Sequence, residues 1–179
     1  EGPIDLLSCS SSLWQLEIRE ALRHREWTVA ATRRPELCGI ATLPSVDRHA
    51  TLALYRQCGE PLLKARLQSI LAAALWPQAK LCKASTKSSP LCPFRSIDAV
   101  EGEMHLWWHC PTWSDQRSGF SHVLSSFRQR GWLPCEAICG IFLLSSYDSA
   151  CVRRQFARDT QRMMLAILEA RASHPLTAL

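Results

Sequence analysis

Apolar residues in the middle of the chain recur at helical spacing, and this pattern most constrains what the chain can fold into. After Pro61 they return every three or four residues, as on one face of a helix. Pro61 suits a first helical position, and Pro77 stops or kinks the helix. The apolar face comprises Leu62, Leu63, Leu67, Ile70, Leu71, Ala74 and Leu75. We expect this helix to form much of the core.

Similar patterns predict helices on both sides of this one. Gly131 is a natural C-terminal cap for one of them. The segment 137–144 is apolar and can be either a short helix or a buried strand. The other predicted helices run from a cap at Ser10–Ser12 to Pro35 at the latest, over about 47–57, over 113–130 and over 149–172. Because alternating strand patterns are scarce, the predicted fold is mainly α.

Composition agrees with a folded domain of ordinary size. The chain has 179 residues, of which 47% are hydrophobic and 21% charged. Its longest uncharged apolar stretches fall short of the ~20 residues of a membrane-spanning helix, so no membrane partner is expected. The sequence opens at Glu1 without a secretory leader, and we expect a piece of a longer chain. Nine scattered cysteines, an odd number, favour a reducing, intracellular compartment.

Positive charge gathers in one stretch of the sequence. Residues 61–97 carry six basic residues and no acid, whereas the net charge of the whole chain is +5. The six are Lys64, Arg66, Lys80, Lys83, Lys87 and Arg95. Such an excess can attract phosphate backbones, although it can equally be a solvated surface.

Soft and imidazole donors are grouped within residues 92–110. Cys92, His105, His109 and Cys110 all lie there. A pair of loop cysteines followed by a helix that carries histidine is a common way to assemble a zinc site. Pro111 disfavours helical geometry at Cys110, which lets that thiolate turn back toward His105. A tetrahedral structural site needs four ligands, so His109 or Cys82 is the candidate for the fourth.

These residues also resemble a known family. The order of Cys92, Glu101, His105, Cys110 and Pro111 is similar to the zinc-binding segment near the C-terminus of non-LTR retrotransposon polyproteins, downstream of the reverse transcriptase. The family spacing is Cys-x2-Cys, an acid four residues before a histidine, then His-x4-Cys-Pro. The likeness covers about residues 14–117 and includes, more loosely, Trp27, Arg33 to Glu36 and Asp47 to Thr51. It implies an intracellular setting, with the nucleus as one option, and an upstream reverse transcriptase as partner.

One family position differs in this chain. Arg95 stands where the second cysteine of the pattern belongs, so a cation replaces a thiolate. Three interpretations stay open: zinc bound with a substitute fourth ligand, weak metal binding, or a shape held by packing around Trp107 and Trp108 alone. For the two tryptophans, core packing is favoured over base stacking. Glu101 is interpreted as a helix cap or a surface charge rather than as a ligand.

Two functions follow from these features. The first is a non-catalytic, nucleic-acid-binding accessory region that supports the upstream polymerase on RNA or DNA. The second is a structural or protein-interaction module, a decayed copy without metal or nucleic-acid binding. An enzyme is not expected, because Cys110 and His109 would point about 100° apart on a helix and no phosphate-binding loop is visible. We predict one helical domain over 1–179, with N-terminal helices in 1–90, a small zinc-finger-like loop-helix insertion in 91–117 and C-terminal helices in 118–179.

Overall fold

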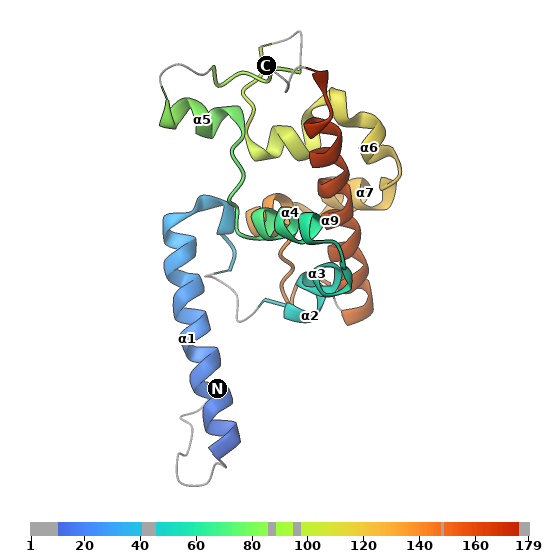
Figure 1. Cartoon of the computed structure of the whole chain (residues 1–179). Helices are drawn as coiled ribbons and strands as arrows, with labels where there is room; N and C mark the ends of the chain where they lie inside the picture. The colour runs from blue at the N-terminus through green and yellow to red at the C-terminus, as the bar shows by residue number, and fades with distance from the viewer. Residues whose placement is uncertain (1–10, 41–45, 86–88, 95–97, 148, 176–179) are drawn as a thin grey trace.

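The computed structural model describes residues 11–40, 46–85, 89–94, 98–147 and 149–175, and these ranges are mainly helical, which confirms the predicted fold class (Figure 1). Two isolated antiparallel bridges, Val46 with Leu143 and Leu91 with Val100, are the β-structure of this described part. None of its helices combines the length and apolar character that a membrane crossing requires.

The helices vary widely in length. The first and last, α1 (Ser11–Arg33) and α9 (Ala150–Ala172), have 23 residues each. Between them lie η1 (Pro35–Leu37), α2 (Arg48–Thr51), α3 (Ala53–Gln57), α4 (Pro61–Leu71), α5 (Gln78–Ala84), the π-helical turn η2 (His105–His109), η3 (Pro111–Trp113), α6 (Ser114–Ser118), α7 (Ser121–Arg130) and α8 (Pro134–Cys139). Helix α1 begins as predicted, although its expected cap at Ser10 lies outside the described residues.

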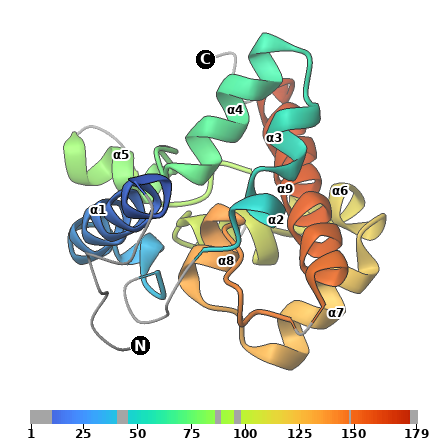
Figure 2. The same ribbon diagram turned by 90° about the horizontal axis from the view of Figure 1, so that it is seen from below.

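Helix α9 is central to the packing of the helices. It contacts α2, α3, α4, α6 and α7, and Figure 2 shows it among them. Met163, Met164 and Ile167 are fully buried, which confirms the predicted terminal helix. Val152, in the first turn of the same helix, is 40% exposed. Several side chains buried in the first half of α9 are polar, among them Arg153, Asp159 and Thr160, and a search for apolar residues overlooks them.

Helix α4 is shorter than predicted. Leu67 and Ile70 are fully buried, as expected of a core helix, but the helix ends at Leu71 and not near Pro77. Ala73 takes a left-handed backbone conformation with φ 51°, which turns the chain out of the helix. Pro77 then precedes α5, a helix that lies where the sequence pattern did not indicate one.

The predicted helix over 113–130 is two helices. Helix α6 ends at Ser118, and Phe120 turns the chain into α7 while its N–H donates to the carbonyl of Arg117 at 2.9 Å. Phe120 packs against the core, so the break lets this ring face inward. Gly131 adopts φ 61°, which confirms it as the C-terminal cap.

Of the two alternatives for 137–144, the helix is found over 137–139, and the described residues after it make an isolated β-bridge but no strand. Helix α8 ends at Gly140, which has φ 62°. The next residues, 141–143, are buried, and Leu143 makes its bridge with Val46. Trp107 and Trp108 donate their indole N–H groups to the carbonyls of Ile138 and Ala137, at 3.1 and 2.8 Å. The tryptophans therefore hold α8 against η2 and are core residues, as predicted.

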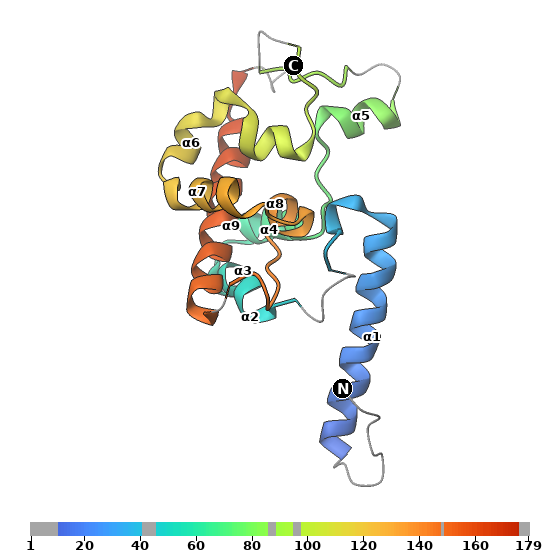
Figure 3. The ribbon, with the colours of Figure 1, turned by 180° about the vertical axis from the view of Figure 1, so that it is seen from behind.

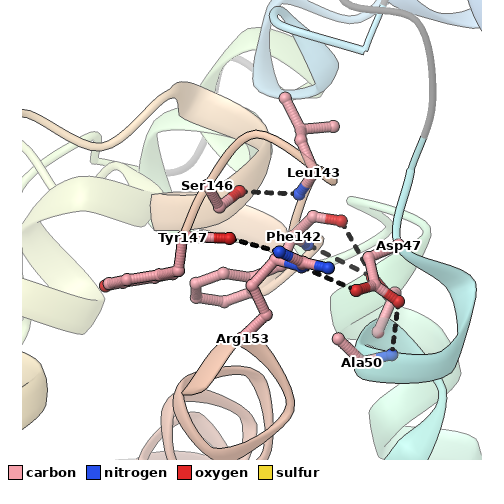
Figure 4. Close-up of polar contacts among 8 residues, drawn as sticks. Asp47, Ala50, Phe142, Leu143, Ser146, Tyr147 and Arg153 are labelled. Carbon is pink, nitrogen blue, oxygen red and sulfur yellow. Dashed lines mark hydrogen bonds and ion pairs between the residues drawn. The ribbon is translucent and has the colours of Figure 1, made fainter. Parts of the chain in front are cut away.

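A buried ion pair joins three distant parts of the chain (Figure 4). Asp47 caps α2 by accepting the N–H of Ala50 at 2.9 Å, and its other carboxylate oxygen lies 2.8 Å from Nε of Arg153 on α9. The N–H of Asp47 donates to the carbonyl of Phe142 at 2.8 Å. Arg153 also donates to the carbonyl of Tyr147. Asp47 and Arg153 together thus connect α2, the 142–147 segment and α9.

Candidate functional site

A π-helical turn shapes the predicted metal site. In η2 the N–H of Cys110 donates to the carbonyl of His105 at 2.7 Å, five residues back. Cys110 itself is extended, with φ −65° and ψ 117°, and Pro111 starts the next short helix. The expectation that Pro111 keeps Cys110 out of a helix is confirmed. Such single π-turns are frequent at functional sites because they bring side chains five residues apart together.

Cys92 reaches the same place from a short antiparallel pairing. Its N–H donates to the carbonyl of Ala99 at 2.8 Å, and the N–H of Glu101 donates to the carbonyl of Pro90 at 2.9 Å. The two sulfur atoms of Cys92 and Cys110 are 3.8 Å apart. The ligand atoms of Cys92, His105 and Cys110 all lie within 4.8 Å of one another. These three side chains form a cluster that could hold a metal ion.

The cluster lies inside the main hydrophobic core. Cys92 is 5% exposed and Cys110 is fully buried, and both pack with Leu67, Trp107 and Met163. Burial raises the pKa of Cys92 to about 11, and the nearby Cys110 and Glu101 act in the same direction. A thiol in this setting stays neutral at pH 7, so it needs a metal cation to become a thiolate.

A buried arginine lies beside the cluster. Arg117 on α6 donates to the carbonyls of Cys110 and Trp107, and burial lowers the pKa of its guanidinium below the usual value. It fixes the backbone on which Cys110 is held.

Glu101 is a helix cap, as one of its two interpretations predicts, and the surface-charge interpretation is wrong. Its side chain is fully buried. Oε2 accepts the N–H of Gln78 at 2.9 Å, and the Glu101 carbonyl accepts that of Ala79 at 3.1 Å, so both serve the first turn of α5. Oε2 also lies 3.0 Å from the guanidinium of Arg171. This partner is 70 residues away, which is why the sequence could not reveal it.

Both proposed fourth ligands lie apart from the cluster. His109 is exposed on η2, with its ring 6.5 Å from that of Phe127. Cys82 is half-buried on α5. Within the described ranges, the groups that meet are those of Cys92, His105 and Cys110. Arg95, the residue at the missing cysteine position, lies outside the described residues.

Three of the four described basic side chains in the 61–97 stretch contact other side chains. Lys64 lies over the ring of Tyr55, 5.6 Å from its centroid. Arg66 pairs with Glu169 at 3.4 Å. Lys80 lies between Glu36 and Glu103, and these carboxylates, opposing the effect of burial, raise the pKa of the Lys80 ammonium.

One further basic side chain of the stretch is described. Lys83 is exposed on α5, while Lys87, like Arg95, falls outside the described residues. The sequence shows how many basic residues the stretch has but not which acids they contact, because Glu36 and Glu103 are far from Lys80 along the chain. It also gave no separate role to Arg33 and Arg34, which flank an exposed tryptophan, Trp76.

Comparisons of the chain with protein-family models, with curated proteins and with solved structures give no match.

Proposed function

We propose that this chain is a non-catalytic, nucleic-acid-binding accessory region organised by a structural zinc ion, and that it supports an upstream reverse transcriptase in a retrotransposon polyprotein. The observation that carries the proposal is the convergence of Cys92, His105 and Cys110 in the segment that resembles the retrotransposon motif. Basic side chains on the surface support the nucleic-acid part.

The residues fit zinc in their chemistry and their spacing. Two thiolates and an imidazole are among the ligands that structural zinc sites use. With Zn–S bonds of about 2.3 Å, two sulfurs on a tetrahedron lie about 3.8 Å apart. The sulfurs of Cys92 and Cys110 are 3.8 Å apart. When bound, zinc would have a structural role and would not take part in catalysis. It would link η2 to the antiparallel pairing that carries Cys92, and the two thiolates would balance its charge.

Metal analysis tests the zinc part. We expect the purified chain to carry one zinc ion, and the Cys92→Ser variant to lose it. At a free zinc concentration of a hundred times Kd, binding should add about 2.7 kcal/mol to the free energy of unfolding. Cys82→Ser is the matched control, because Cys82 lies outside the cluster. Zinc-free protein with unchanged stability in zinc would contradict the site and favour the decayed module.

A salt series tests the nucleic-acid part. Labelled single-stranded RNA, single-stranded DNA and duplex DNA are titrated with the full chain at several salt concentrations. For single strands the slope of log K against log salt is about −0.7 per phosphate contact, so about three contacts predict an approximately 20-fold loss of affinity between 50 and 200 mM salt. Absent binding at low salt, or binding that ignores salt, would refute this function and leave the protein-interaction module.

A further inference from the structure

A groove runs between α1 and the segment that links α4 to α5. Figures 1 and 3 show this linking segment beside the C-terminal end of α1. The part of the groove nearest the linker has a volume of about 360 Å³ and is lined by Arg33, Arg34, Trp76 and Lys80, among others. A second hollow of about 640 Å³ follows α1 from Leu22 and shares Arg33 and Arg34 with the first. The two hollows therefore adjoin at these two arginines.

Trp76 is an exposed aromatic side chain on the segment that links α4 to α5. Its exposed fraction is 59%, in contrast to the fully buried Trp107 and the 2% exposed Trp113. The left-handed turn at Ala73 ends α4 and leads the chain into the segment that carries Trp76. An indole held on the surface in this way has a free face on which a planar group can stack.

The groove is cationic around this indole. Arg34 donates to the carbonyl of Ala72, so its guanidinium is tied to the segment that carries Trp76. Arg33 is exposed on the last turn of α1, and Arg25 lines the second hollow. The lining includes two acids, Glu26 and Glu36, and the carboxylate of Glu36 is paired with Lys80. Glu26 is therefore the one lining acid without such a lysine partner, and it lies among three guanidinium groups, those of Arg25, Arg33 and Arg34.

We propose that this groove binds single-stranded nucleic acid, with a base stacked on Trp76 and backbone phosphates bound by Arg33 and Arg34. Guanidinium groups match phosphate oxygens in geometry and charge, and base stacking on an aromatic platform requires an unpaired base. An acidic or apolar peptide would not need the planar face. The proposal rests on the proposed function and assigns the phosphate contacts to Arg33 and Arg34, which precede the 61–97 stretch.

Fluorescence anisotropy of the full chain with labelled oligo(dT) and oligo(rU) of about 12 nucleotides tests the groove. We expect Trp76→Ala to weaken binding about tenfold or more, and Trp76→Phe to retain most of the affinity. Arg33→Ala should make the salt slope shallower by about 0.7, the value for one phosphate contact on a single strand. Arg128→Ala is the matched control, because Arg128 is an exposed arginine on α7, away from the groove.

The possible outcomes distinguish failure of the groove proposal from failure of the proposed function. If the chain binds single strands with salt dependence but Trp76→Ala and Arg33→Ala bind like the parent, the groove proposal is wrong and the proposed function stands. Equal affinity for duplex DNA would also overturn it, since paired bases cannot stack on Trp76. If the parent chain binds no nucleic acid at low salt, both proposals fail. If Arg128→Ala weakens binding as much as Arg33→Ala does, binding depends on the overall positive charge of the surface, and the groove proposal is wrong.

Discussion

Replacing Asp47 with asparagine is expected to lower the free energy of unfolding by about 3 kcal/mol or more, because it leaves Arg153 buried without its counter-charge. The side chains of Asp47 and Arg153 are 8% and 10% exposed, so water can replace little of the lost interaction. Asparagine keeps an oxygen for the N–H of Ala50, so the cap of α2 survives and the charge alone is removed. Urea unfolding measures the effect.

The same pair predicts how stability responds to acid. Burial of Asp47 is opposed and outweighed by the hydrogen bond from Ala50 and the charge of Arg153, which hold the pKa of this carboxyl below its usual value. The folded state therefore gains stability that is complete above the ordinary carboxyl pKa of about 4 and is lost as the pH falls through the lower folded value. Asp47→Asn should show a shallower decline below pH 4 than the parent.

Two controls make the result specific. Asp98→Ala removes an exposed acid and should change stability by less than about 0.5 kcal/mol. The double variant Asp47→Asn with Arg153→Met removes both charges, and it should be more stable than Asp47→Asn alone, because no buried ion is left unpaired. If Asp47→Asn unfolds at the same urea concentration as Asp98→Ala, the pair does not contribute as argued.

Local patterns in the sequence predict the elements of this fold better than their ends. The spacing of Leu67 and Ile70 is enough to identify a buried helix, and Gly131 is enough to end one. The left-handed turn at Ala73 has no such signal, because alanine ordinarily favours helix. The break at Phe120 depends on burying its ring against residues that are distant in sequence, which a local window cannot include.

The sequence likewise predicts some residues of the candidate site and misses the roles of others. Cys92, His105 and Cys110 are near one another in sequence, so their grouping predicts the cluster that the fold brings together. The buried role of Glu101 depends on Arg171, a partner that only the folded chain brings near. The groove at Trp76 depends on α1 approaching the α4–α5 linker, for which the sequence carries no spacing signal.

Replacing Trp107 with alanine is expected to lower the free energy of unfolding by about 3–5 kcal/mol, the range for removing a large aromatic side chain from a core. Trp107 is fully buried, and its indole N–H donates to the carbonyl of Ile138 at 3.1 Å. The variant leaves a cavity between η2 and α8 and removes the partner of a carbonyl on the last turn of α8. Trp107→Phe keeps most of the ring and loses the N–H, so it should cost less.

Trp76→Ala is the matched control for Trp107→Ala, because it removes the same side chain from an exposed position. Surface substitutions usually change stability by less than about 0.5 kcal/mol, so urea unfolding should separate the two variants widely. In the binding assay the order is reversed, because Trp76→Ala lowers oligonucleotide affinity directly. Equal losses of stability in both variants would contradict the assignment of Trp107 to the core and of Trp76 to the surface.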